Sequence, residues 1–135
     1  MIGVVVCTHG PLAEALLATA RMIVGEFPAA TTVAVERGDG MEGILERLRA
    51  AVADVDGGEG VILLCDMFGG TPSNLSLSLL GDHLEVVTGV NLPMLLKLYT
   101  GRSGDLCEVA ATARDHGRQN ILVAGELLRG KGKPS

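Results

Sequence analysis

The sequence has almost no aromatic residues: two phenylalanines, one tyrosine and no tryptophan in 135 residues. Its core must therefore be built from valine, leucine, isoleucine and alanine. Cysteine is also scarce, with three residues, an odd number, and none at CxxC spacing. This count argues against a disulfide framework and against a zinc site, and it fits free thiols in a reducing compartment. We expect no bound metal.

Positive charge is in short supply as well. The chain has 11 lysines and arginines against 16 acidic residues, a net charge of −5, which argues against a nucleic-acid partner. No apolar run approaches the roughly 18 residues of a membrane-spanning segment. Met1 leads directly into a strand-like stretch without a basic leader, so no signal peptide is expected. These absences predict a cytoplasmic protein.

Three common motifs are missing. The sequence has no GxxxxGK[ST] loop, no GxGxxG after the first strand and no GxSxG elbow. A Walker-type NTPase, a dinucleotide site and an α/β-hydrolase nucleophile are therefore disfavoured. We expect no cofactor.

Apolar residues make up 47% of the chain, enough for one folded domain in 135 residues. Strands are predicted over residues 2–7, 31–35, 61–65, 83–88 and 120–124. Helix starts are predicted at Pro11, after Asp39 as a cap, at Thr71 before Pro72, at Asn91, and at Ser103 or Asp105 with Gly117 closing the last helix. Strands that alternate with helices are typical of a doubly wound α/β fold with a mostly parallel sheet.

The connections predict the strand order 2134. The chain places its second strand on one side of the first, then returns to add the third and fourth on the other side. Open sheets of this kind bind ligands at the switch point, here between the first and third strands, beyond their carboxyl ends. His9 follows the first strand and Asp66 ends the third. We expect these two side chains to converge on one crevice.

The loops that follow both strands contain glycines and lead into helix N-termini. Free N–H groups and the positive ends of helix dipoles favour an anion, phosphate above all. We therefore expect Gly10, Gly69, Gly70 and Thr71 to bind phosphate. Each of these signals alone has a plain structural interpretation as a turn or a helix start, and only their joint placement indicates a site.

The chemistry predicted for His9 is nucleophilic. A histidine near a helix N-terminus stays neutral at pH 7. A carboxylate such as Asp66 on one ring nitrogen fixes the tautomer, aims the other nitrogen outward and stabilises positive charge on the ring. Phosphoryl transfer depends mainly on such positioning and electrostatic help.

One competing motif lies close by. The tripeptide "THG" looks like the Arg-His-Gly motif of the histidine phosphatases, which also form a phosphohistidine. Here Thr8 stands in place of the arginine that clamps phosphate in that family. The substitution weakens a phosphatase interpretation, and the chain is also short for that family.

Three segments together carry a stronger resemblance: "IGVVVCTHGPLAEAL", "VILLCDMFGGTPSN" and "EVVTGVNLPMLLKL". They resemble the IIA domain of the mannose-family (mannose/fructose/sorbose) sugar phosphotransferase system, over nearly the whole chain. The second segment is close to that family's Asp-Leu-hydrophobic-Gly-Gly-(Ser/Thr)-Pro-x-Asn pattern.

The resemblance implies a phosphocarrier. His9 would take a phosphoryl group from phospho-HPr and pass it to a histidine of a IIB partner. Asp66 matches the carboxylate that supports that histidine, and Thr71 matches the small hydroxyl residue of the phosphate-binding loop.

The resemblance also implies a homodimer. Besides the four-stranded 2134 core, the family has a fifth, antiparallel C-terminal strand that is exchanged between subunits, and residues 120–124 match it. Residues 1–128 would form a single IIA phosphocarrier domain, and residues 129–135 a flexible tail.

Phe68 departs from the family pattern. It stands where many relatives carry tryptophan, which indicates a surface hydrophobe for partner docking. Nothing in the chain resembles an appended IIB domain, so IIB is expected as a separate chain. Contact with the membrane is expected only indirectly, through the permease complex.

Three functions remain open at this point. The first is a phosphorelay transferase that feeds sugar uptake. The second is a regulatory phosphoprotein, in which the same phosphorylation of His9 signals to a partner outside transport, since a phosphoryl group adds about −1.5 to −2 charges. The third is a phosphatase or other hydrolase.

Overall fold

A computed structural model describes residues 1–130 of the chain. Helices and strands alternate through most of its length, as predicted. In chain order the elements are β1 (Gly3–His9), α1 (Leu12–Val24), β2 (Ala30–Val35), α2 (Met41–Val55), β3 (Val61–Cys65), α3 (Thr71–Leu77), β4 (Leu84–Thr88), α4 (Leu92–Thr100), α5 (Leu106–Gln119) and α6 (Ala124–Gly130).

The four strands form one parallel sheet of order β2-β1-β3-β4, which confirms the predicted order. Cys7 of β1 is paired with Cys65 of β3, and His9 is paired with Val35 of β2. All four strands therefore end at the same edge of the sheet. This register places His9 and the residue that follows Cys65 at the switch point of the topology.

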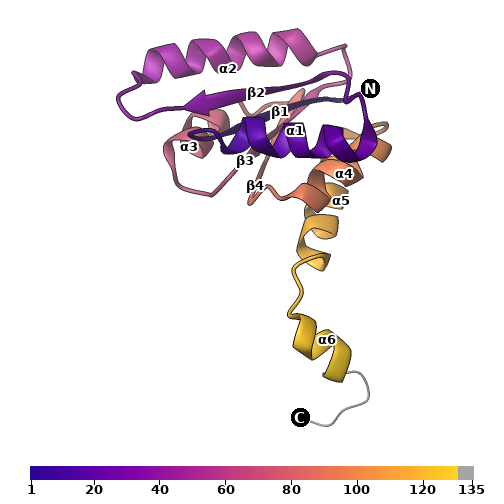
Figure 1. Cartoon of the computed structure of the whole chain (residues 1–135). Helices are drawn as coiled ribbons and strands as arrows, with labels where there is room; N and C mark the ends of the chain where they lie inside the picture. The colour runs from indigo at the N-terminus through magenta and orange to yellow at the C-terminus, as the bar shows by residue number, and fades with distance from the viewer. Residues whose placement is uncertain (131–135) are drawn as a thin grey trace.

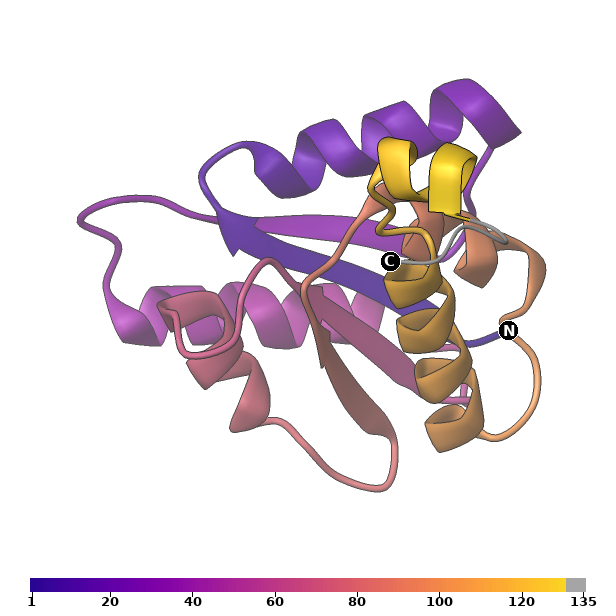
Figure 2. The ribbon, with the colours of Figure 1, turned by 90° about the horizontal axis from the view of Figure 1, so that it is seen from below.

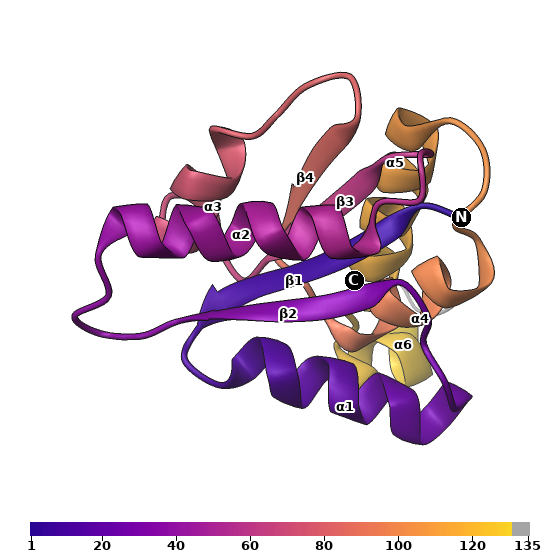
Figure 3. The same cartoon turned by 90° about the horizontal axis from the view of Figure 1, so that it is seen from above.

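Helices cover both faces of the sheet. Figure 1 shows α2 above the sheet with α1, α4 and α5 below it, and Figure 3 shows α2 lying across the strands. Alternate residues of β1 enter different cores: Val4 and Val6 pack on the side of α1, α4 and α5, whereas Val5 and Cys7 pack on the side of α2 and α3. Burial on both faces explains why residues 3–7 of β1 and all of β3 are apolar.

Side-chain caps confirm two of the predicted helix starts. The Asn91 side chain accepts the N–H of Met94 at 3.0 Å, and its amide donates to the carbonyl of Gly117 at 3.0 Å, joining α4 to α5. Asp105 caps α5 by accepting the N–H of Glu108 at 3.1 Å. Each such cap is worth about 1 kcal/mol.

Three local predictions are wrong. Asp39 does not cap α2, because its carboxylate accepts the N–H of Glu36 at 2.8 Å and pairs with Arg47 at 2.9 Å instead. Gly70, one residue earlier than expected, occupies the N-cap position of α3. Gly117 lies inside α5 rather than at its end, where it packs against the side chains of Met94 in α4 and of Asn91, the cap of α4.

The fifth strand predicted over residues 120–124 is absent from the single described chain. Residues 121–123 have no regular structure, and α6 begins at Ala124. A strand needs a neighbouring strand to satisfy its N–H and C=O groups. Figure 1 shows that the connection and α6 lie beyond the end of α5, away from the strands, and Figure 2 shows the molecule from that side. The tail predicted over 129–135 begins inside α6, and residues 131–135 lie outside the described part.

No helix within residues 1–130 combines the length and the apolar surface that crossing a membrane requires.

Candidate functional site

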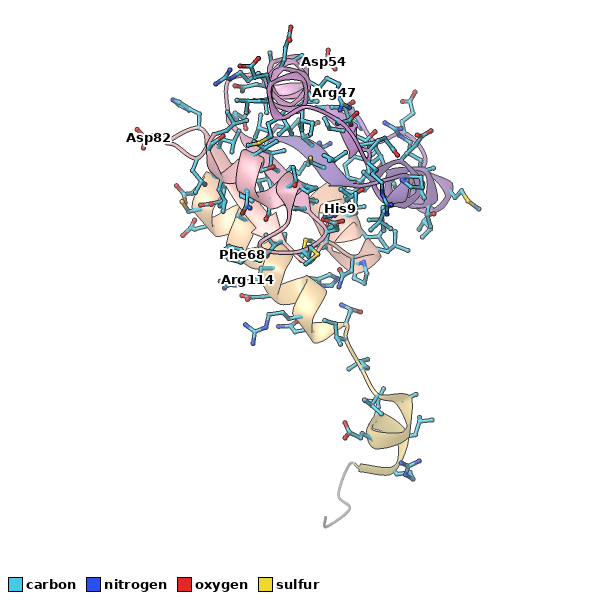
Figure 4. The ribbon with its side chains drawn as sticks, turned by 90° about the vertical axis from the view of Figure 1, so that its left-hand side faces the viewer. His9, Arg47, Asp54, Phe68, Asp82 and Arg114 are labelled. Atoms are coloured by element: carbon cyan, nitrogen blue, oxygen red, sulfur yellow. The ribbon has the colours of Figure 1, made fainter. Side chains whose placement is uncertain are left out.

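His9 and Asp66, 57 positions apart in the sequence, are in contact. Nδ1 of His9 lies 2.8 Å from Oδ2 of Asp66, and the backbone N–H of His9 donates to the same oxygen at 3.0 Å. One carboxylate oxygen thus holds both the ring and the backbone of the histidine. Figure 4 looks onto this edge of the sheet, where His9 stands between neighbouring loops.

The carboxylate of Asp66 is ionised at neutral pH. Burial raises its pKa, but hydrogen bonds from the His9 ring and backbone, attraction to His9 and a bond from the N–H of Met67 outweigh burial and hold the pKa below its usual value. Its Oδ1 accepts the Met67 N–H at 3.0 Å, so both oxygens are fixed. The Asp66 side chain is 15% exposed, which leaves its charge only partly hydrated.

This geometry selects the tautomer of His9. An ionised carboxylate can only accept hydrogen bonds, so Nδ1 must carry the proton. In the neutral ring the other nitrogen, Nε2, then has its lone pair free. The His9 side chain is 50% exposed, so a reactant can reach the ring. The arrangement is that of an oriented nucleophile backed by a partly buried carboxylate.

Gly70 lies against the histidine ring. A Cβ atom at this position would lie 2.8 Å from Cε1 and 3.3 Å from Nε2 of His9. Contacts under 3.0 Å require something to shift, so only glycine fits beside the ring as it stands. Gly70, the second glycine of the "GG" pair, therefore leaves room for the ring of His9.

Two of the glycines predicted to bind phosphate donate their N–H groups to acceptors within the protein. The N–H of Gly10 donates to the carbonyl of Val35 at 2.9 Å. The N–H of Gly69 donates to the hydroxyl of Ser73 at 2.8 Å. Both glycines have positive φ, +56° and +94°, so they shape the loops around His9. The phosphate-binding role predicted for Gly10, Gly69, Gly70 and Thr71 stays a prediction.

Thr8 is a positioning residue that sequence reasoning missed. It is fully buried, and its hydroxyl accepts the N–H of Ala13 at 2.7 Å, which ties the start of α1 to the residue before His9. The available signal was a hydroxyl residue four positions before Leu12, the first residue of α1. Ser73 was also missed; its hydroxyl holds Gly69 and donates to the carbonyl of Gly70 at 3.1 Å.

A cavity of about 520 Å³ adjoins the histidine. It is lined by His9, Gly10, Val35, Glu36, Arg37, Gly38, Asp39, Ile44 and Thr71. Three segments therefore meet at this cavity: the β1–α1 turn, the β2–α2 loop and the start of α3. Its size accommodates a phosphoryl group together with part of the molecule that carries it.

Apolar side chains border the histidine on its exposed side. Phe68 is 70% exposed and Met67 is 55% exposed, both on the loop between Asp66 and Gly70. Leu12, at the start of α1, is 44% exposed. Figure 4 shows Phe68 on the loop near His9. Apolar side chains of this size, left exposed around a reactive group, are suited to a protein partner.

The buried cysteines take no part in this chemistry. Burial raises the pKa of the Cys7 thiol to about 12, with smaller contributions from Cys65 and Asp66, so Cys7 remains a neutral core residue. Within residues 1–130 no group of three or more histidine, cysteine, aspartate or glutamate side chains is placed to hold a metal ion.

Comparison with known proteins gives a consistent picture. A family model described as "PTS system fructose IIA component" matches residues 3–113, which include His9 and Asp66. The chain is 34% identical over 131 residues to the PTS system fructose-specific EIIA component of Bacillus subtilis (strain 168), covering 95% of this chain and 90% of that protein.

Two further matches bear on its length and fold. The chain is 36% identical over 124 residues to the PTS system mannose-specific EIIAB component of Escherichia coli (strain K12), covering 89% of this chain but only 38% of that protein. The structure of the mannose/sorbose specific IIA subunit from Enterococcus faecalis superimposes with a TM-score of 0.82 at 30% identity, covering 90% of this chain and 93% of that one.

Proposed function

We propose a function from one premise: this chain belongs to the mannose-family IIA components of the sugar phosphotransferase system, which are phosphotransferase phosphocarriers. In this proposal, His9 accepts a phosphoryl group from phospho-HPr and passes it to a histidine of a IIB partner for sugar uptake. The contact of 2.8 Å between Nδ1 of the half-exposed His9 and Oδ2 of Asp66, which leaves the lone pair of the neutral ring on Nε2, is the observation that carries the proposal.

The transfer step follows from the tautomer. The Nε2 lone pair of His9 attacks phosphorus, the P–N bond of the donor phosphohistidine breaks, and its electron pair returns to the donor ring. The His9 ring becomes positively charged while Nδ1 keeps its proton, and ionised Asp66 stabilises that charge. Thr71 and the N–H of Gly70 supply hydrogen bonds to the phosphoryl oxygens. Onward transfer to IIB reverses these roles.

The proposal includes the docking partners. HPr and IIB would cover the exposed apolar side chains beside His9, with Phe68 at the centre of the contact. Contact with the membrane would be indirect, through the permease complex. The three cysteines are all free, which suits the reducing conditions of the cytoplasm.

Incubation with phosphoenolpyruvate, Enzyme I and HPr tests the function directly. The chain should acquire an acid-labile phosphoryl group that maps to His9, and should lose it when a mannose-family IIB protein is added. A label that forms but does not pass to IIB would favour the regulatory phosphoprotein. Release of inorganic phosphate from a small monoester would favour the hydrolase.

Gly70→Ala should slow phosphoryl transfer to His9 by about 10²-fold. The added methyl group would displace the ring from the position that Asp66 gives it, and a displacement near 1 Å costs roughly this much in rate. The measurement is a rapid-quench time course with phospho-HPr. Gly57→Ala, where a Cβ would meet nothing within 4 Å, is the matched control and should react at the wild-type rate. Equal rates for both variants would contradict the packing role of Gly70.

A homodimer with an exchanged fifth strand is also part of the proposal. Ile121, Leu122 and Val123 are 74%, 60% and 63% exposed in the single chain. β4 is an edge strand of the sheet, and a groove of about 370 Å³ lies between β4 and α5. The segment 121–123 of one chain, added antiparallel to β4 of another, would cover the open edge of β4 and bury its own apolar side chains.

The double variant Ile121→Asp/Val123→Asp should therefore be monomeric. Charges on one face of the added strand would oppose its burial against the second copy. Sedimentation should give about twice 14.0 kDa for the unchanged chain and 14.0 kDa for the variant. Met22→Asp, on α1 and 85% exposed, controls for added charge and should stay dimeric. A monomeric unchanged chain would refute the exchange.

A further inference from the structure

The β2–α2 loop forms one wall of the cavity beside His9 and is held firmly in place. The carboxylate of Asp39 accepts the N–H of Glu36 at 2.8 Å and the guanidinium of Arg47 at 2.9 Å. Arg47 also donates to the carbonyl of Ala34 at 2.8 Å, which ties α2 to the end of β2. Gly38, with φ of +93°, makes the turn within the loop. Arg37, between Glu36 and Gly38, is thus presented by a braced loop.

The charges around the cavity single out Arg37. Among the described residues that line it, Arg37 is the one arginine or lysine. The ion pairs within residues 1–130 do not include it. Asp39, two positions away, is already paired with Arg47. Glu36 and Asp39 both line the cavity. Because Asp39 is paired with Arg47, Glu36 is the one lining acid outside an ion pair, and Arg37 has no carboxylate partner among the described residues.

A cation at this place would favour the binding of a phosphoryl group. His9 contacts an ionised carboxylate, which repels an incoming phosphoryl group. The N–H groups of Gly10 and Gly69 are already used by Val35 and Ser73. In phosphoryl transfer, charge accumulates on the three equatorial oxygens, and an arginine that donates to them stabilises the transition state.

We propose that Arg37 is the phosphate-binding cation of this site, reaching across the cavity to the oxygens of the phosphoryl group on its way to Nε2 of His9. This inference rests on the proposed phosphocarrier function and adds to it a residue from a third segment of the chain. The sequence motifs did not indicate Arg37, because it is distant in sequence from both the "THG" and the "GGTP" segments.

Potassium phosphoramidate, a small phosphoryl donor, tests Arg37 without any docking partner. Nε2 attacks phosphorus, the P–N bond of phosphoramidate breaks with its electron pair on nitrogen, and ammonia leaves. Arg37→Gln should lower the second-order rate constant for labelling of His9 by about tenfold, the scale of one charge-assisted hydrogen bond. Arg37→Lys should keep most of the rate, because the charge remains.

Arg49→Gln is the matched control. Arg49 is exposed on α2 and does not line the cavity, and both glutamine variants change the net charge from −5 to −6. Labelling is followed by intact mass at neutral pH, and thermal unfolding verifies that all four chains are folded.

The outcomes separate the inference from the function on which it rests. Slow labelling of Arg37→Gln alone, restored in Arg37→Lys, supports the inference. Equal rates for Arg37→Gln and the unchanged chain overturn it, as does equal slowing in Arg49→Gln, which would assign the effect to net charge. Failure of the unchanged chain to be labelled by phosphoramidate or by phospho-HPr would instead remove the proposed function.

Discussion

His9→Ala is expected to abolish acid-labile phosphorylation by phospho-HPr and leave the fold intact. The reacting atom, Nε2, is lost with the ring, so no residual rate should remain. The stability cost should be small, about 1 kcal/mol for one lost hydrogen bond. The side chain is half exposed, and Asp66 keeps its bonds from the backbone N–H groups of His9 and Met67.

Labelling and unfolding measured on the same samples check both parts of this expectation. His83→Ala is the matched control: His83 is exposed just before β4 and does not line the cavity beside His9, so that variant should be labelled like the unchanged chain. Label that persists in His9→Ala would place the acceptor on another residue. An unfolded His9→Ala protein would show that the ring supports the fold, contrary to its exposure.

The order of the sheet and the meeting of His9 with Asp66 could be predicted because both follow from chain-wide patterns. Wholly apolar runs mark strands that are buried on both faces, and the rule for right-handed crossovers leaves few ways to order them. Once the first and third strands are neighbours, the residues at their carboxyl ends must lie close together. His9 and Asp66 meet for that reason, whatever the details of the loops.

Local hydrogen bonds could not be predicted in the same way. The sequence shows that Gly10 and Gly69 lie in loops, but not that Val35 and Ser73 take their N–H groups. Asp39 has the spacing of a helix cap, yet it pairs with Arg47 from the next turns of α2. When a polar side chain has several possible hydrogen-bond partners within reach, three-dimensional geometry decides which one it takes, and residue spacing alone does not contain that geometry.

The C-terminal segment shows a different limit of prediction from the sequence. Residues 120–124 have the composition of a strand, and the prediction of a strand there used the family resemblance as well as the pattern. A pattern can report that Ile121, Leu122 and Val123 suit a strand, but not whether the neighbouring strand belongs to the same chain. In one chain these side chains are exposed, and the proposed exchange with a second copy would cover them.

Asp66→Asn is expected to slow phosphoryl transfer to His9 by up to about 10⁴-fold, the loss that the same change causes at the supporting aspartate of a Ser-His-Asp triad. Asparagine keeps the size of the side chain but removes the charge that stabilises the positively charged phospho-imidazole ring. Its amide group can also present a donor to Nδ1, which would favour the tautomer with the proton on Nε2 and block attack. Single-turnover rates with phospho-HPr measure the effect.

The same substitution has a predicted pH signature. The pKa of Asp66 in the folded chain lies below its usual value, so the ionised carboxylate stabilises the fold at pH values above its unfolded pKa of about 4. That contribution is lost as pH falls through the lower folded pKa. The gap in unfolding temperature between the unchanged chain and Asp66→Asn should therefore be present at pH 7 and narrow as the pH falls below about 4.

Asp54→Asn, on the exposed face of α2 (Figure 4), is the control and should alter neither the transfer rate nor this pH profile. A wild-type transfer rate in Asp66→Asn would leave the carboxylate with a structural role alone.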